Sequence, residues 1–258
     1  MTKNKSSGRT EAFIFGTHPV LETLKAGKRS VEALFASRDY AGHGELGSLC
    51  DERRLQIKQI SPPDLTSLVG SPHHQGIAAK VGPFPYVDLD DVFSDSSDKP
   101  LPVVILDGVQ DPVNLGNVLR VAECLGGSCV VIGKDRSVGV TPVAEKASAG
   151  AAAHVPVVRV VNLVRTIEQL RDLGFWMYAA DAQAADTCYS ADLGLRTVFV
   201  LGSEGKGLRR LVRGACDFSI SIPLSGRVAS LNVAQTAAVL LAETQRRRLG
   251  GGRPNPGP

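Results

Sequence analysis

The sequence lacks the patterns of several common protein classes. Its five cysteines are scattered over 258 residues, none lies in a CxxC pair, and their odd number argues against a disulfide framework. The five histidines do not stand beside the cysteines at zinc-ligand spacing, so we predict no metal site. Unpaired cysteines suit a reducing compartment, and we expect a cytoplasmic protein.

Long apolar segments are also missing. No apolar run approaches the about 18 residues that can cross a membrane, so we expect no membrane partner. The first residues, MTKNKSSGRTEAF, lack the apolar core of a secretory signal. Residues 1–11 are polar, and residues 250–258 are rich in glycine and proline. We expect both ends to be disordered tails.

Charge of one sign is in only slight excess. The formal net charge is +3, which does not by itself predict a nucleic-acid partner. Local basic clusters are more suggestive, although such a cluster is more often a solvated face than a phosphate site. The clusters are Lys28-Arg29, Arg53-Arg54, Arg209-Arg210 with Arg213, and Arg246-Arg247-Arg248.

What is present is the pattern of two α/β domains. Residues 12–85 form the first expected unit, with a strand at Val31–Ala36. A polar, turn-rich stretch follows, and we predict a linker over residues 86–100. Strands and helices then alternate from residue 101 to 249, with one buried strand at Cys129–Gly133. Such alternation argues for a parallel sheet covered by helices.

The C-terminal part of the second unit brings two strand ends and two glycine-bearing loops close together in sequence. A strand at Thr197–Leu201 ends at the turn Gly202–Gly207, and a strand at Phe218–Ile222 ends at Pro223. A long apolar helix is expected to open at Ser230, which can serve as its N-cap. Open α/β sheets bind ligands where strands end, so we expect a binding site here. The turn is neither GxGxxG nor a P-loop.

Three long segments resemble the motifs of the SpoU family of RNA 2'-O-ribose methyltransferases. DGVQDPVNLGNVLRVAECLG, residues 107–126, resembles the first motif. LGSEGKG resembles the second, and IPLSGRVASLNVAQTAAVLLAE resembles the third. In the first unit, FGTHPVLE and HHQG resemble the substrate-binding domain of the large-ribosomal-RNA branch, with His73 in place of the family's asparagine.

The resemblance implies a fold, a reaction and partners. Residues 101–249 would form a parallel-sheet methyltransferase domain with a deep trefoil knot. Residues 12–85 would form a small ribosomal-protein-like α/β domain that binds the RNA substrate. The protein would be a homodimer that uses S-adenosylmethionine to methylate a ribose, specifically of a guanosine in 23S ribosomal RNA.

The resemblance also implies the site residues. Arg120 would activate the ribose 2'-hydroxyl, either as a base or as a cation that steadies the alkoxide. Asn114 would be its companion, and Glu204 would orient Arg120 or the substrate. Ser230 and Asn232 would lie beside the methyl-transfer site. Contacts to the cofactor, mostly through the backbone, would come from Gly202, Ile222 and Leu231.

Other interpretations remain open at this point. Asn114 and Arg120 stand six residues apart, which does not place them on one helical face, and Arg120 could simply pair with Glu123 or lie on the surface. The target could be transfer RNA, or the protein could be an antibiotic-resistance methyltransferase. An NAD-dependent Rossmann oxidoreductase would need GxGxxG after its first strand, where this chain has Asp107-Gly108-Val109-Gln110-Asp111. A non-catalytic RNA-binding module would not need all five predicted catalytic residues.

Overall fold

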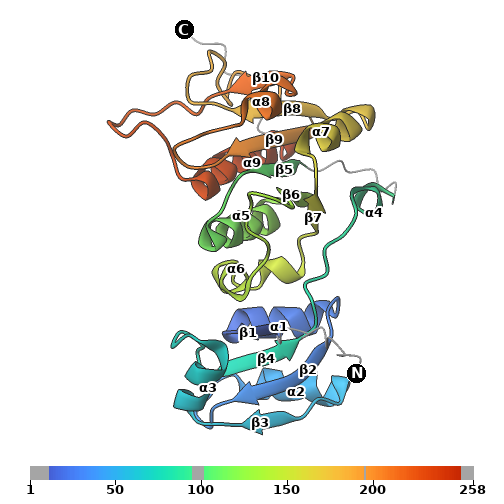
Figure 1. Ribbon diagram of the computed structural model, residues 1–258, viewed down its shortest axis with the longest axis vertical. Coiled ribbons are helices and arrows are strands. Elements are labelled where there is room, and N and C mark those ends of the chain that lie inside the picture. Colours follow the sequence, from blue (N-terminus) through green and yellow to red (C-terminus); the bar gives the residue numbers. More distant parts are fainter. Residues whose placement is uncertain (1–11, 95–101, 195, 251–258) are drawn as a thin grey trace, which may run out of the picture. The chain divides into compact units, whose positions relative to one another are not determined.

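The computed structural model describes residues 12–94, 102–194 and 196–250 (Figure 1). The chain divides into two compact units, of which the first ends at Pro85 and the second begins at Tyr86. Apart from Gly250, the predicted tails lie outside the described residues. No helix in the described part of the chain is long and apolar enough to cross a membrane.

The first unit is a four-stranded sheet with helices on both faces. Its elements are β1 Ala12–Phe15, α1 Thr17–Ala26, β2 Val31–Ala36, α2 His43–Arg53, β3 Ile57–Gln59, α3 Pro62–Val69 and β4 Ile77–Val81. The strand order is β1-β4-β2-β3. Strand β4 pairs antiparallel with β1 and β2, whereas β3 runs parallel to β2.

Strand β4 is central because it is apolar on both faces. Ile77 and Ala79 pack into the core that contains Leu24 of α1 and Leu46 of α2. Ala78, which points the other way, packs in a second cluster with Leu65 of α3. The continuous apolar run therefore places helices on both sides of this small sheet.

The turn before β4 is held by a buried histidine. His74 Nδ1 accepts a hydrogen bond from the Gly76 N–H at 3.0 Å, and its Nε2 lies 3.1 Å from Thr66 Oγ1. Gln75 adopts a left-handed backbone with φ of 55° and accepts the Thr17 N–H at 3.1 Å. His73 is exposed. His74 thus has a structural role in the HHQG turn, whereas His73 is available to solvent.

The second unit is built on a parallel sheet. Its strands are β5 Val103–Asp107, β6 Cys129–Gly133, β7 Val157–Val160, β8 Trp176–Ala180, β9 Thr197–Gly202 and β10 Phe218–Ile220. They lie in the order β10-β8-β9-β5-β6-β7, and every neighbouring pair is parallel. The predicted parallel α/β class is therefore confirmed.

Helices cover both faces of this sheet. They are α4 Leu89–Phe93, α5 Pro112–Leu125, α6 Pro142–Ala147, α7 Leu163–Asp172, α8 Arg210–Gly214 and α9 Val233–Arg248, with a 3₁₀ turn at Ala151–Ala153. Helix α7 packs Ile167 and Leu170 against Ile105 and Val200. Side chains alternate along a strand, so Leu106 and Leu201 point to the opposite face, where α5 and α9 pack together.

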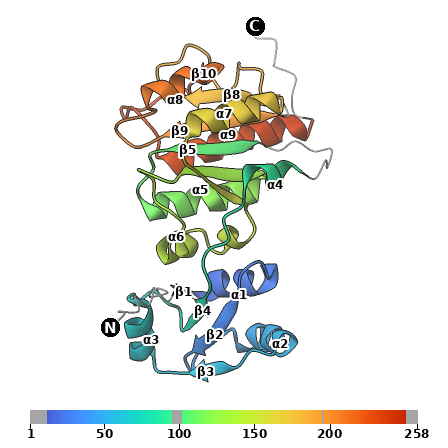
Figure 2. The same cartoon turned by 45° about the vertical axis from the view of Figure 1, so that its right-hand side comes forward.

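Helices α5 and α6 approach each other unusually closely. They lie side by side in both views of the molecule (Figures 1 and 2). A Cβ atom at Gly116 of α5 would stand 2.3 Å from the Ala144 carbonyl oxygen and 2.6 Å from Ala147 Cβ. Only glycine permits this approach. The glycine between Asn114 and Arg120 is thus explained by helix packing.

Part of the predicted linker is ordered structure of the second unit. The Val87 N–H donates to the Val157 carbonyl at 3.1 Å, and the Tyr86 hydroxyl accepts the Val140 N–H at 2.8 Å. Leu89 is buried and Phe93 packs against the same core. The prediction of a linker over 86–100 is therefore corrected for residues 86–94, where apolar side chains stand among the acidic ones. Residues 95–100 lie outside the described residues.

The basic cluster at the end of α9 is largely structural. Hydrogen bonds from Arg246, and then from Arg247, hold the pKa of Glu243 at about 2, well below its ordinary 4.5. Arg247 also donates to the carbonyls of Cys188, Tyr189 and Ala191. Arg247 thereby fastens the segment after β8 to α9, while Arg246 is paired with Glu243 within the helix.

Candidate functional site

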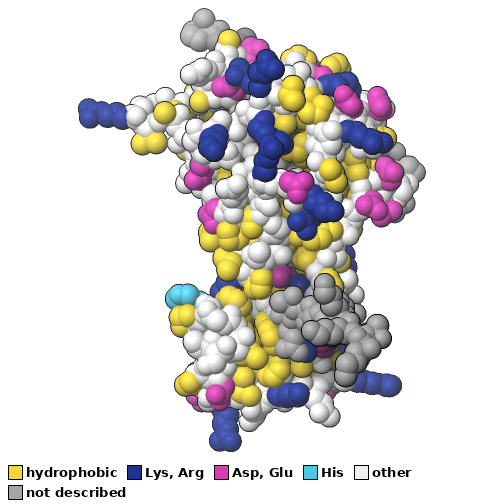
Figure 3. Space-filling view, viewed as in Figure 1, with side chains coloured by type: hydrophobic (Ala, Val, Ile, Leu, Met, Phe, Trp, Pro, Cys, Tyr) yellow, Lys and Arg dark blue, Asp and Glu magenta, His cyan; other side chains and the backbone are white. Residues whose placement is uncertain are grey.

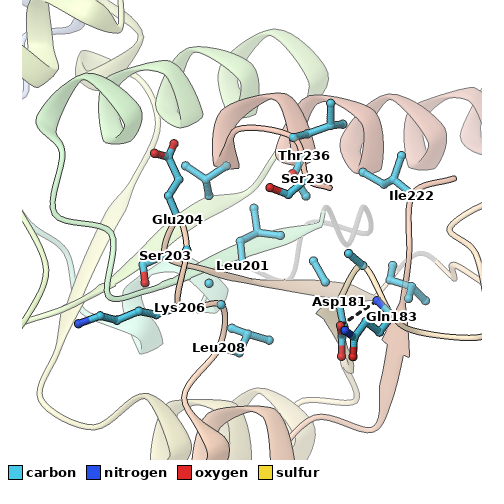
Figure 4. Close-up of a pocket in the computed structure, with 18 of the residues that line it drawn as sticks. Asp181, Gln183, Leu201, Ser203, Glu204, Lys206, Leu208, Ile222, Ser230 and Thr236 are labelled. Carbon is cyan, nitrogen blue, oxygen red and sulfur yellow. Dashed lines mark hydrogen bonds between the residues drawn. The ribbon is translucent and has the colours of Figure 1, made fainter. Parts of the chain in front are cut away.

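A cavity of about 470 Å³ opens at the carboxyl ends of β8, β9 and β10 (Figure 4). All strands of this sheet are parallel, so their ends meet at one edge and their loops diverge there. Its walls combine apolar and polar groups and come from segments that are distant in the sequence. The apolar part is formed by a set of aliphatic side chains. They include Leu201, Leu208, Ile220, Ile222, Leu231 and Leu240.

The glycine turn after β9 forms one rim of the cavity. The Gly207 N–H donates to the Ser203 carbonyl at 2.9 Å, which closes the turn. Gly205 and Gly207 have φ values of 77° and 62°, which other residues adopt only with strain. A Cβ atom at Gly202 would stand 2.2 Å from the Gly207 carbonyl carbon. Gly202 therefore lines the cavity and also lets the turn fold back on its own strand.

A hydrogen-bonded cluster joins the three predicted motifs. Asn114 Nδ2 donates to Glu204 Oε1 at 3.0 Å. Asn232 Nδ2 donates to the same Glu204 oxygen at 2.6 Å and to Asn114 Oδ1 at 2.8 Å. Asn114 lies in the first turn of α5 and is buried, whereas Glu204 is exposed. The cluster fixes the direction of the carboxylate at the rim of the cavity.

Asn232, not Ser230, caps helix α9. Asn232 Oδ1 accepts the Ala234 N–H at 2.9 Å, and Gln235 Oε1 accepts the Asn232 N–H at 3.2 Å, a complete capping box. The prediction that the helix opens at Ser230 is therefore wrong, because asparagine caps as well as serine does. Ser230 is instead an exposed residue that lines the cavity, as do Ile222 and Leu231.

Arg120 stands apart from this cluster. It is exposed on α5, whereas Asn114 is buried, in agreement with their six-residue spacing. It is not among the residues that line the cavity. Within residues 12–94, 102–194 and 196–250 it has no hydrogen-bond or ion-pair partner, Glu123 included. The structure thus brings together Asn114, Glu204 and Asn232 but leaves Arg120 outside.

A buried aspartate that the sequence analysis did not predict holds a residue that follows the glycine turn. Asp107 ends β5, and its side chain is fully buried. It accepts the Arg209 backbone N–H at 2.8 Å and the Arg209 Nε–H at 2.6 Å. This pair ties the end of β5 to the start of α8, immediately after the turn. The sequence did contain a signal for this residue. Asp107 ends an otherwise apolar strand, and a carboxylate buried there needs a partner.

Another aspartate that the sequence analysis did not predict lies in the wall of the cavity itself. Asp181 directly follows β8, and its Oδ1 accepts the Gln183 N–H at 3.0 Å (Figure 4). Arg213 of α8 lines the same part of the cavity. As for metals, the described residues contain no group of three or more His, Cys, Asp or Glu side chains placed to hold an ion.

Known proteins share both units of this chain. Residues 102–242 match the SpoU rRNA Methylase family, and residues 13–87 match the family described as RNA 2'-O ribose methyltransferase substrate binding. A Bacillus subtilis protein described as the putative TrmH family tRNA/rRNA methyltransferase YacO is 36% identical over 240 residues, 92% of this chain and 96% of the relative. A Staphylococcus haemolyticus protein with the same family description is 42% identical over 199 residues, 76% of this chain and 80% of the relative.

Solved structures agree. The SpoU methyltransferase AviRb from Streptomyces viridochromogenes, in complex with the cofactor AdoMet, superposes with a TM-score of 0.79 at 25% identity and covers 97% of this chain and 95% of its own. These matches exclude the Rossmann-type oxidoreductase as an interpretation. The chain belongs to the SpoU rRNA Methylase family and is an RNA methyltransferase, as the three motifs predict.

Proposed function

We propose that this protein transfers the methyl group of S-adenosylmethionine to a ribose 2'-hydroxyl of RNA, specifically of a guanosine in 23S ribosomal RNA. The observation that carries the proposal is the Asn114–Glu204–Asn232 cluster, which joins all three motifs at the rim of the cavity. The names of the curated relatives, which include both tRNA and rRNA, support RNA as the substrate class.

The cavity fits the cofactor. Its volume of about 470 Å³ lies within the roughly 300 to 1,000 Å³ that is typical of small-molecule sites. Apolar walls and backbone groups suit an adenine ring, and Gly202, Ile222 and Leu231 would hold it there. When bound, S-adenosylmethionine supplies an electrophilic methyl group on a sulfonium. The AdoMet complex of AviRb supports this assignment.

The residues at the rim have separate roles in the proposal. Two amide donors fix Glu204, so its carboxylate can orient the substrate without searching for a conformation. Ser230 offers a hydroxyl in the lining of the same cavity. Arg120 stabilises the developing alkoxide or, with its proton withdrawn by an RNA phosphate, acts as the base. An arginine is otherwise always protonated, which favours the electrostatic role.

We also propose that the active unit is a homodimer in which the partner copy supplies Arg120. The exposed position of Arg120, outside the cavity of its own chain, supports this. A mixture of Arg120→Ala and Asn232→Ser subunits tests it. If Arg120 acts across the interface, mixed dimers contain one complete site and recover activity. A monomer by ultracentrifugation, or a mixture as inactive as its components, would remove this part of the proposal.

The first unit would bind the RNA. A hollow of about 340 Å³ on this unit is lined by Lys28, Arg29 and Arg53. Arg29 is fixed there, since its Nε donates to the Gly82 carbonyl at 2.7 Å and its guanidinium lies 5.8 Å from the centre of the Phe84 ring. Convergent cations of this kind suit phosphate oxygens.

The surface of the second unit does not indicate where the RNA would bind. On the face that Figure 3 shows, Lys and Arg side chains (dark blue) are scattered among Asp and Glu side chains (magenta). A cytoplasmic location and a trefoil knot in the C-terminal segment complete the proposal, and both rest on the family.

Mapping of ribose methylation tests the target. Total RNA from cells with and without the gene is compared at every 2'-O-methyl position. The proposal expects one guanosine of 23S ribosomal RNA to lose its methyl group. Loss of a methyl group from transfer RNA instead would establish the alternative target, and an unchanged map would contradict both.

A further inference from the structure

An ion pair in the cavity wall has no role in the three motifs. Arg213 Nη2 of α8 lies 2.5 Å from Oδ2 of Asp181, and both residues line the cavity. The carboxylate is largely buried, with 16% of its side chain exposed, whereas 55% of the Arg213 side chain is exposed. A fixed anion thus holds one edge of a guanidinium whose remainder is accessible.

Asp181 is well suited to hold a cation in place. Its Oδ1 accepts the Gln183 N–H, and its own N–H donates to the Ile220 carbonyl at 2.9 Å, so the residue is fixed between β8 and β10. The ionic contact with Arg213 does not follow a hydrogen-bonding direction, and among the described residues the buried Oδ2 has no hydrogen-bond donor. The pair therefore retains unused donors and an unsatisfied acceptor.

The other charged residues of the lining are differently placed. Glu204 is engaged by two amides at the rim. Lys206 lies on the same turn, and Figure 4 shows its side chain directed away from the other labelled residues. Among the described residues that line the cavity, Arg213 is therefore the cation best placed to meet an anion inside it.

We propose that Arg213 binds the carboxylate at the amino-acid end of S-adenosylmethionine and that Asp181 is its positioning residue. This inference rests on the proposed function and specifies how its cofactor is recognised. The planar guanidinium matches a carboxylate with two parallel N–H donors. Because Asp181 already restricts the side chain, less conformational entropy is lost on binding.

Two ligands separate this role from a general effect on the cavity. S-adenosylhomocysteine carries the amino-acid end, whereas 5'-methylthioadenosine shares the nucleoside and the sulfur but has no carboxylate. Affinities are measured by calorimetry on the full chain. Arg213→Gln should weaken the affinity for S-adenosylhomocysteine by about 10- to 100-fold, which is the effect expected for loss of a hydrogen bond to a charged group. The same variant should bind 5'-methylthioadenosine as the wild type does.

Controls use neighbouring residues. Arg210→Gln, on the same helix as Arg213 but outside the cavity lining, should leave both affinities unchanged, whereas Asp181→Asn should weaken only the binding of S-adenosylhomocysteine. Arg213→Lys keeps the positive charge but lacks the two parallel N–H donors, so it should lose an intermediate part of the affinity for S-adenosylhomocysteine. This variant replaces Arg213→Gln in the test if Arg213→Gln does not fold. Unchanged affinity for S-adenosylhomocysteine, or an equal loss for both ligands, would overturn the inference. A wild-type protein that binds neither ligand would instead overturn the proposed function, and the inference with it.

Discussion

Asn232 performs two tasks that different substitutions can separate. Its Oδ1 caps α9 by accepting the Ala234 N–H, while its Nδ2 donates to Glu204 and Asn114. Serine at this position can still accept the Ala234 N–H, but it cannot replace both amide donors. Alanine removes the cap and the donors together.

The structure sets the expected magnitudes. Loss of the cap costs about 1 kcal/mol of unfolding free energy. Loss of the donors leaves Oδ1 of the buried Asn114 without its bond, which costs about 1–3 kcal/mol. Asn232→Ser should therefore be destabilised by about 1–3 kcal/mol, and Asn232→Ala by about 1 kcal/mol more. Both variants remove one of the two amide donors that orient Glu204, so both should slow methyl transfer by about 100-fold.

Urea unfolding and single-turnover methyl transfer to RNA measure the two effects on the same preparations. The decisive comparison is activity in Asn232→Ser. If that variant transfers methyl groups at nearly the wild-type rate while Asn232→Ala does not, Asn232 acts through helix capping alone. The reasoning about the Asn114–Glu204–Asn232 cluster would then be refuted.

Three further predictions concern packing, pH and RNA. Gly116→Ala should destabilise the chain by about 1–3 kcal/mol, because its methyl group meets the Ala144 carbonyl. In contrast, Gly47→Ala in α2 meets nothing within 4 Å and should stabilise by about 0.5–1 kcal/mol; similar urea midpoints for the two would contradict the packing argument. Glu243→Gln should lower the free energy of unfolding by about 1–2 kcal/mol at pH 7. The lowered pKa of Glu243 sets an upper bound of about 3 kcal/mol, and solvent screening reduces it because the partner Arg246 is half exposed. The lowered pKa stabilises the fold above pH 4.5, so the difference from wild type should shrink as pH falls toward 2, and a pH-independent difference would exclude this cause. Lys28→Glu with Arg53→Glu should weaken RNA binding and flatten its salt dependence while cofactor affinity stays constant; an unchanged salt slope would exclude the hollow on the first unit.

Local patterns were sufficient for much of the fold. The strands Val31–Ala36 and Cys129–Gly133 have the predicted bounds, because each is an apolar run between turn residues. The start of α9 was misplaced by a few residues because Ser230 and Asn232 are both good caps. The pair Asn232 and Gln235 has the spacing of a capping box and could have resolved the choice.

The site depends on contacts that no local pattern contains. Asn114 and Asn232 are separated by 118 residues, and Asp107 and Arg209 by 102. Only the family resemblance joined Asn114, Glu204 and Asn232 before the structure did. Asp181 and Arg213 lie outside the three motifs, so the resemblance gave neither of them a role, and Arg213 stood out only as a member of a basic cluster. A knot is likewise invisible to periodicity, because it is a property of the path and not of any segment.

The most direct test of the account is methyl transfer itself, measured in a single turnover with S-adenosylmethionine and 23S ribosomal RNA. The wild type should methylate one ribose 2'-hydroxyl, and Arg120→Ala should be slower by about 100- to 10,000-fold with unchanged cofactor affinity and melting temperature. Near-normal transfer by Arg120→Ala would remove Arg120 from the chemistry. Absence of ribose methylation by the wild type on both ribosomal and transfer RNA would contradict the proposed function.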